Sequence, residues 1–209
     1  MAFPPTNQPP DTRSRILDAA ARLFHEQGFN ATGVSTILRE AGVNPGSLYN
    51  LFPSKDALLA AVLERYTELL HPIVMEPVEK KTSDPIERVF ALLQQYREWY
   101  SPLEFRLGCP IGNLALEVAD SHPEIRPLIQ QNFDGWSAYV RKWLDDAGDR
   151  LPRDLDRKQL AATVLTVMEG GLMQARSSRS AAAYDASVGQ LRAYFDLLLA
   201  RASAGRTQP

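Results

Sequence analysis

The sequence predicts an all-α protein. No segment of its 209 residues sustains the alternation of polar and apolar residues that marks a strand. Instead, apolar residues recur at spacings of three and four in the long segments, as on one face of a helix. Hydrophobic residues make up 44% of the chain, enough for a sizeable core. No apolar run approaches the roughly 18 residues of a membrane span.

The first expected helix begins at Asp11 or Thr12 and ends at Gly28. Aspartate and threonine are good N-caps, and glycine readily adopts the backbone conformation that closes a helix. The inner stripe of this helix comprises Ile16, Ala19, Ala20, Leu23 and Phe24. We expect it to support the segment that follows.

Residues 32–55, TGVSTILREAGVNPGSLYNLFPSK, predict two very short helices joined by a tight turn. Thr32 or Ser35 caps the first helix, whose inner face comprises Val34, Ile37, Leu38 and Ala41. Gly42 ends this helix, because a left-handed backbone costs glycine little. Asn44, Pro45 and Gly46 make the turn, and helix resumes at about Pro45. This is the outline of a helix-turn-helix.

In the second short helix, Leu48 and Phe52 face inward. Ser47 and Asn50 therefore face outward, with Gly46 and Tyr49 beside them. So short a helix is not stable alone, because helix nucleation is costly, and its exposed groups suggest a binding function. Hydroxyl, amide and phenol groups, together with a glycine that lets backbone N–H groups approach an anion, suit a phosphate backbone and a major groove.

Over residues 12–62 the sequence resembles the TetR-type transcriptional regulators. The match comprises ILDAAARLFHEQGF, T-x-V-x-x-I, AGV, G-S-L-Y, F-x-S-K and Leu58. The resemblance implies that Thr32 and Ser35 lie at phosphates and that Lys55 clamps the DNA backbone. It also implies a groove-facing element made of Asn44, Pro45, Gly46, Ser47, Tyr49 and Asn50. Two positions depart from the family's pattern: Leu38 stands where alanine is common, and Leu51 where an aromatic residue or histidine is common.

The charge of the chain is unusual for a protein that binds nucleic acid, because the formal net charge is −2. Residues 1–65 are neutral, since Lys and Arg at 13, 15, 22, 39, 55 and 65 balance Asp and Glu at 11, 18, 26, 40, 56 and 64. Non-specific DNA affinity should therefore be weak. Binding should rely on helix N-termini and neutral donors.

Further helices are expected along the rest of the chain. One runs from Ser54 to a kink or end at Pro72, and residues 78–83 form a charged connection. Helices then begin at Asp84-Pro85, at Pro110 and at Ser121, where Ser121 and Glu124 fit a capping box. We expect a disordered arm (1–10), a three-helix DNA-binding domain (11–65), a helical effector-binding and dimerisation domain (66–203) and a disordered tail (204–209).

The last two helices carry the densest apolar pattern, and two mid-helix glycines, Gly170 and Gly171, favour the close approach of another helix. We expect a homodimer in which these helices from both subunits form a four-helix bundle. The alternative is that they complete the core of a monomer. The interface residues in the dimer hypothesis are Leu160, Val164, Met168, Gly171, Leu172, Leu191, Phe195 and Leu198.

A pocket for a mostly apolar small-molecule effector is expected in the C-terminal domain. Its candidate residues are Trp99, Phe105, Cys109, Asn113, Glu117, Trp136, Tyr139, Glu169 and Met173. Cys109 precedes Pro110 and is expected to cap the next helix, where the helix dipole favours a reactive thiolate. GCPIGNLALE also resembles a segment of NemR-like regulators in which a cysteine senses electrophiles. The alternative is that Cys109 is a small buried hydrophobe.

The hypothesis is therefore a ligand-responsive DNA-binding regulator, with repressor implied by the resemblance alone. Its partners are operator DNA, an effector and a second copy of the chain, with no cofactor. His25, His71 and His122 lack metal-site spacing and are expected to be exposed, and no metal is expected. The single cysteine and an N-terminus unlike a secretory signal favour the cytoplasm. A helical protein adaptor and, with no catalytic constellation to support it, an enzyme are the alternatives.

Overall fold

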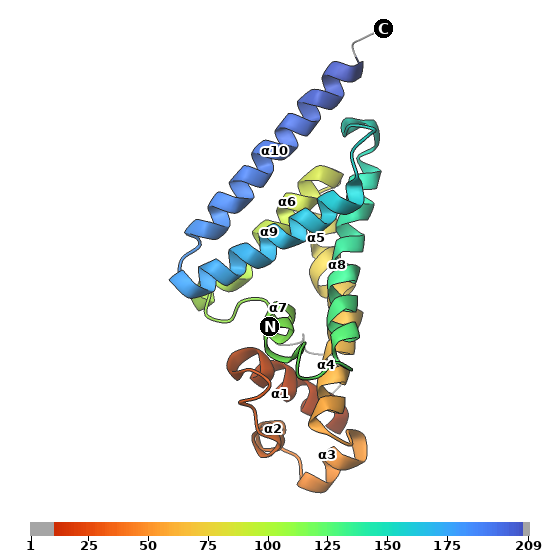
Figure 1. Ribbon diagram of the computed structural model, residues 1–209. Helices are drawn as coiled ribbons and strands as arrows, with labels where there is room; N and C mark the ends of the chain where they lie inside the picture. Colours follow the sequence, from red (N-terminus) through yellow and green to blue (C-terminus); the bar gives the residue numbers. More distant parts are fainter. Residues whose placement is uncertain (1–10, 207–209) are drawn as a thin grey trace. The chain divides into compact units, whose positions relative to one another are not determined.

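The computed structural model describes residues 11–206, except for the side chains of Pro45, Ser47, Leu48 and Arg206. All regular elements in this range are helices, which confirms the predicted fold class (Figure 1). None of the helices in the described range is long and apolar enough to cross a bilayer. The expected arm, 1–10, and the last three residues of the expected tail lie outside the described residues.

The chain forms two compact units, and the division differs from the expected one. The first unit contains residues up to Leu69 and also Pro110–Asn132, while the second contains Leu70–Cys109 and the chain from Phe133 onward. The first boundary lies near the expected residue 65. The return of residues 110–132 to the first unit was not expected, because it depends on contacts between residues far apart in the sequence.

The first unit contains α1 (Thr12–Gln27), α2 (Val34–Ala41), α3 (Pro45–Leu51), α4 (Lys55–Leu69), α7 (Pro110–Val118) and the start of α8 (Arg126–Asp146). Asp11 caps α1 by accepting from Ser14 N at 2.7 Å, and Ser54 caps α4 by accepting from Ala57 N at 3.0 Å. Gly42 ends α2 in the left-handed region with φ of 64°. The predicted helix-turn-helix is confirmed as two short helices joined by a tight turn.

The second unit begins with a π-helical segment, Leu70–Met75, around the predicted break at Pro72. It continues with α5 (Glu76–Lys81), α6 (Pro85–Tyr100), the rest of α8, α9 (Arg157–Ser178) and α10 (Ala182–Arg206), with short 3₁₀ turns at Ser101–Leu103 and Gly148–Arg150. Three expectations were wrong. Most of the connection expected at 78–83 is helical, as are residues 204–206 of the expected tail. Ser121 does not start a helix, because its hydroxyl contacts the His122 ring and α8 begins only at Arg126.

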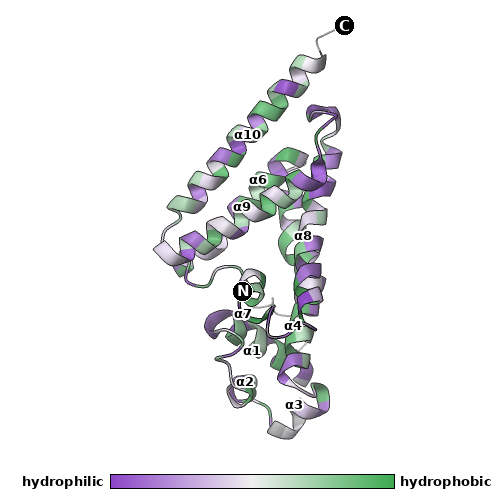
Figure 2. Ribbon diagram, viewed as in Figure 1, coloured by the Kyte–Doolittle hydropathy of each residue, from purple (hydrophilic) through white to green (hydrophobic). Residues whose placement is uncertain are grey.

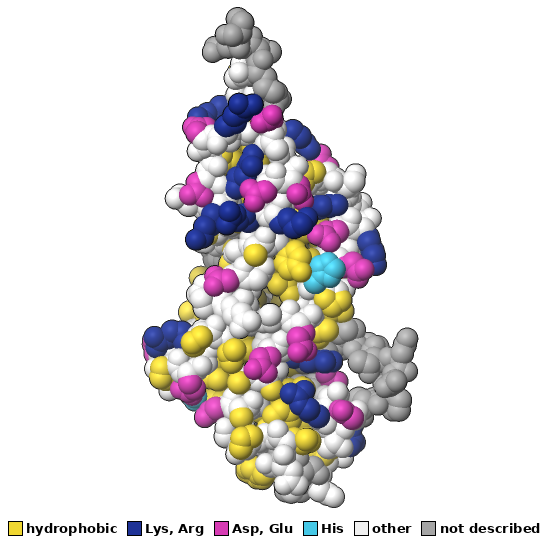
Figure 3. Space-filling model, turned by 90° about the vertical axis from the view of Figure 1, so that its right-hand side faces the viewer, with side chains coloured by type: hydrophobic (Ala, Val, Ile, Leu, Met, Phe, Trp, Pro, Cys, Tyr) yellow, Lys and Arg dark blue, Asp and Glu magenta, His cyan; other side chains and the backbone are white. Residues whose placement is uncertain are grey.

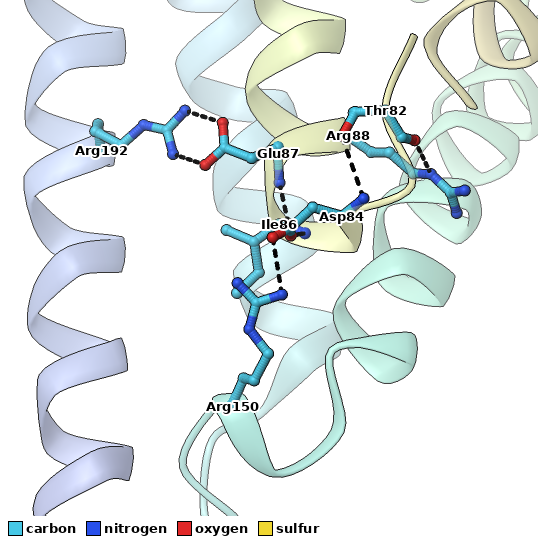
Figure 4. Close-up of polar contacts among 7 residues, drawn as sticks. All are labelled: Thr82, Asp84, Ile86, Glu87, Arg88, Arg150 and Arg192. Carbon is cyan, nitrogen blue, oxygen red and sulfur yellow. Dashed lines mark hydrogen bonds and ion pairs between the residues drawn. The ribbon is translucent and has the colours of Figure 1, made fainter. Parts of the chain in front are cut away.

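Charged side chains tie the start of α6 to two other segments of the second unit (Figure 4). Asp84 caps α6 by accepting from Ile86 N at 2.9 Å, and Arg150 donates to its other oxygen at 3.0 Å. Mainly because of that bond from Arg150, the pKa of Asp84 is lowered. Arg192 of α10 forms two hydrogen bonds with Glu87, at 2.6 and 2.9 Å. These pairs fix the position of α6 beside α10.

The residues expected at the dimer interface belong to the core of the protomer, so that assignment was wrong. These residues are buried in the second unit between α6, α8, α9 and α10: Leu160, Val164, Met168, Gly171, Leu172, Leu191, Phe195 and Leu198. The helical period identifies a buried face correctly but does not say which helix covers it. Here the covering helices come from the same chain.

The two mid-helix glycines of α9 differ in their surroundings. A Cβ on Gly171 would lie 2.8 Å from the Tyr184 ring and 3.3 Å from Tyr184 Cα, so close helix approach does require this glycine. The approaching helix is α10 of the same protomer. A Cβ on Gly170 would meet nothing within 4 Å, so Gly170 opens onto the surface. Figure 2 shows that hydrophilic and hydrophobic residues are mixed along these two helices.

Candidate nucleic-acid interface

The exposed face of α2 and α3 contains several of the predicted DNA-binding residues. Ser35, Asn44, Gly46 and Asn50 are exposed, and the ring of Tyr49 is 60% exposed. The inward-facing Ile37 and Phe52 are buried beneath this face. An exposed phenol and amide on a short helix supported from below can reach base edges. The side chains of Pro45 and Ser47 lie outside the described residues.

Thr32 does not lie where a phosphate could reach it, so its expected contact was wrong. Its side chain is 1% exposed, and its hydroxyl donates to Gly28 O at 2.6 Å and to Leu23 O at 3.3 Å. Thr32 therefore closes the turn after α1. Of the two residues expected at phosphates, Ser35 is the exposed one.

Lys55 also has a different environment from the expected backbone clamp. Its Nζ donates to Phe29 O at 2.5 Å and lies 4.2 Å from the centre of the Phe29 ring. Burial lowers the pKa of Lys55, opposed by the nearby charges of Glu117 and Asp56. In this structure the ammonium group stabilises the α1–α2 loop.

The remaining charges agree with the near-neutral charge counted for residues 1–65. Arg22 pairs with Glu26 at 3.2 Å and with Glu40 at 2.7 Å, which neutralises much of its charge. Arg13 lies over the Phe52 ring at 5.4 Å. On the face drawn in Figure 3, positive and negative side chains are interspersed, so no single-sign patch appears there. Specific contacts must therefore supply more of the affinity than long-range attraction.

The second unit contains a largely buried polar cluster that includes part of the predicted effector site. Trp136 Nε1 donates to Tyr96 OH at 3.2 Å, and the Tyr96 and Trp99 rings lie 5.5 Å apart. The Cys109 thiol donates to the Glu169 carboxylate. Glu169 Oε1 is buried without a hydrogen-bond partner, which is a costly arrangement for an ionised carboxylate.

Burial is the first cause of the altered acidity of this cluster. It raises the pKa of Glu169, against a smaller lowering by the Cys109 hydrogen bond. It also raises the pKa of Tyr96 well above its ordinary value, assisted by the nearby Cys109. These groups fit a ligand with a hydrogen-bond donor or a cation. No group of three or more His, Cys, Asp or Glu residues suited to a metal occurs among residues 11–206.

The raised pKa of Glu169 predicts a pH dependence of stability. The folded protein holds this proton to a higher pH than the unfolded chain, so the free energy of unfolding falls as pH rises from about 4.5 through the raised pKa. The loss is about 1.4 kcal/mol for each unit by which the pKa is raised. Glu169→Gln should remove this loss, measured by urea unfolding between about pH 4 and 8. Equal pH profiles of the wild type and the variant would contradict it, and the exposed Glu68→Gln is the control.

Other predicted effector residues lie elsewhere. Met173 is 58% exposed on α9, and Tyr139 stacks on His71 at 5.7 Å. Asn113 and Glu117 lie on α7 in the first unit, and the Glu117 carboxylate accepts from Phe29 N and Asn30 N at 2.9 and 2.7 Å. Glu117 is therefore occupied by the protein's own backbone, which contradicts its assignment to a ligand pocket.

Phe105 is buried in the core of the second unit.

Sequence reasoning missed two residues near the polar cluster, Tyr96 and Tyr184. Tyr184 OH donates to Leu93 O at 2.7 Å, and burial raises its pKa. The helical period placed Tyr96 on an apolar face, but nothing in the pattern indicated that either hydroxyl lies near Glu169. His25 was expected to be exposed and is 4% exposed.

Comparisons with known proteins agree with this geometry. Residues 16–62 match the family model "Bacterial regulatory proteins, tetR family", and residues 85–191 match "Tetracyclin repressor-like, C-terminal domain". An uncharacterised helix-turn-helix transcriptional regulator of Bacillus subtilis, YxaF, is 31% identical over 78% of this chain and 84% of its own. The transcriptional repressor NemR of Escherichia coli is 28% identical over 81% of this chain and 86% of its own.

Solved structures give the same result. The reduced form of Escherichia coli NemR superposes with a TM-score of 0.77 at 27% identity, covering 87% of this chain and 95% of that one. A TetR regulatory protein from Rhodobacter sphaeroides has a TM-score of 0.78 at 21% identity, over 86% of this chain and 96% of that one, which supports the fold alone. Two family models and a relative above 30% identity cover both parts of the chain. The chain belongs to the tetR family of bacterial regulatory proteins.

Proposed function

We propose that this protein is a sequence-specific DNA-binding transcriptional regulator that represses its target genes until an effector releases it. The observation that carries the proposal is α3, a helix of seven residues whose exposed Tyr49 and Asn50 have no role in the core. Membership of the tetR family supports regulation, and similarity to the repressor NemR supports repression. Such a regulator would act in the cytoplasm, where its DNA is.

The proposed functional form is a homodimer that uses the exposed faces of α9 and α10. On α10, one helical face carries mostly uncharged, exposed residues, with the charged Arg201 near its end: Ala186, Gln190, Ala193, Tyr194, Leu197 and Ala200. Tyr194 is 45% exposed and Leu197 69%, which is costly for large hydrophobic side chains unless a partner covers them. On α9 the corresponding face carries Gln159, Thr163, Thr166, Gly170, Met173 and Gln174. Gly170 would allow a partner helix to approach closely.

A dimer of this kind would present one α3 helix to each half-site, with half-sites about 34–36 Å apart or a multiple of that distance. The cluster of Tyr96, Cys109, Trp136 and Glu169 is the proposed effector site in each second unit. An effector bound there would release the operator by favouring a conformation that binds DNA poorly. Cys109 donates to a carboxylate, which supports the alternative of a packed thiol.

The proposal predicts that the protein enriches a two-fold symmetric DNA sequence from a random pool. Selection at moderate salt, followed by sequencing, measures both the half-site and the spacing. A helical adaptor for protein partners would enrich no sequence, and that result would overturn the regulator assignment. A monomeric DNA binder would enrich a single half-site, which would overturn the dimer alone. The exposed Tyr49 and Asn50 of α3, which form the proposed reading face, favour the regulator over the adaptor.

A further inference from the structure

The loop between α1 and α2 is held by side chains from two other helices of the first unit. Glu117 of α7 accepts from Phe29 N at 2.9 Å with one oxygen and from Asn30 N at 2.7 Å with the other. Lys55 of α4 donates to Phe29 O at 2.5 Å. These contacts join residues far apart in the sequence, so the loop is fixed by tertiary structure.

The backbone is shaped to receive the Glu117 carboxylate. Gly28 has φ of 89°, a conformation that favours glycine, and a Cβ there would lie 2.9 Å from Glu117 Oε2. The carboxylate lies at the C-terminal end of α1, where the helix dipole disfavours a negative charge. The helix dipole therefore does not explain the position of this carboxylate. Its position is explained by the two N–H donors and by the nearby Lys55 ammonium.

The Phe29 side chain reinforces the same connection. It is 2% exposed and contacts the His122 ring edge to face, with ring centres 5.2 Å apart. His122 follows α7, and its Nε2 lies 3.6 Å from Asp56 Oδ1 at the start of α4. The loop is thus held by α7, by the turn after it and by the first turn of α4.

We propose that Glu117 is a positioning residue for operator binding, through which α7 sets the start of the helix-turn-helix. The loop that it holds ends at Gly33, immediately before α2, and α2 supports α3. A shift of α7 would withdraw both acceptors together and free the loop. α7 begins directly after Cys109, the last residue of a segment of the second unit, so it is one of the covalent connections through which a change in that unit would reach α2 and α3. This inference rests on the proposed DNA-binding function.

The test compares Glu117→Gln with Glu124→Gln on the operator found by selection. Glu124 is an exposed acid of the same segment and has the same charge. We expect Glu117→Gln to weaken operator binding about tenfold and to speed hydrogen exchange of the Phe29 and Asn30 amides by at least about tenfold, because a charge-assisted pair is lost. The salt dependence of binding should stay unchanged, since no phosphate contact is removed. Glu124→Gln should behave as the wild type.

Affinity is measured under conditions in which urea unfolding shows each variant to be fully folded, so a purely structural role would leave the affinity unchanged. Unchanged operator affinity in Glu117→Gln, or weaker binding without faster exchange at Phe29 and Asn30, would overturn the proposal. If Glu117→Gln does not fold, Gly28→Ala replaces it in the test, because the added Cβ would displace the Glu117 carboxylate. The same two measurements and the same criteria apply. If the wild type selects no DNA, the regulator assignment itself fails, which is a different outcome.

Discussion

Replacing Leu197 by glutamate is expected to convert the homodimer into monomers and to weaken operator binding by about 100- to 10,000-fold. Leu197 is 69% exposed in the protomer, so the substitution leaves the core intact. In the proposed dimer the new carboxylate would be buried against a mostly uncharged surface, and Arg201, one turn further along α10, already pairs with Asp154. The loss of affinity follows because each monomer binds one half-site and the second contact is no longer intramolecular.

Analytical ultracentrifugation and DNA titration measure the two effects separately. Leu103→Glu is the matched control, because Leu103 is 45% exposed in a 3₁₀ turn outside α9 and α10. If Leu197→Glu remains a dimer, the interface lies on another surface of the protein. A monomer that keeps full operator affinity would show that dimerisation is not needed for binding.

Local chemistry predicted the parts of the fold that depend on neighbouring residues. Asp11 and Asp84 cap helices as expected, because a side chain two or three residues from an N–H group can reach it in only one local geometry. Gly42 ends α2 because glycine adopts the left-handed backbone conformation at little cost. Ser121 had the same local signature but contacts His122, so a capping box can lose to a competing neighbour.

Partners distant in the sequence could not be predicted. The helical pattern predicted that Leu160 and Phe195 are buried. The same residues would be buried in the core of a monomer and in a dimer interface, so the pattern did not distinguish the two. The same limit applies to polar side chains. The partners of the Glu117 carboxylate are backbone N–H groups nearly 90 residues away in the sequence. A carboxylate on a helix carries no sequence signal that separates a ligand site from such a contact. The family resemblance supplied the expected DNA-binding residues without reference to such contacts, and Thr32, one of them, is buried.

Tyr49→Ala and Asn50→Ala are each expected to cost about 1–3 kcal/mol of specific binding at each half-site, with little loss of stability. Both side chains are exposed, so removing them leaves no cavity. If they read bases, each variant should lose preference at one operator position, while a phosphate contact would weaken all sequences equally. Repeating the selection with each variant distinguishes these outcomes, and Tyr49→Phe separates the phenol hydroxyl from the ring. The exposed Gln131→Ala serves as the control. Unchanged affinity and unchanged preference in both variants would contradict the assignment of α3 as the helix that reads bases.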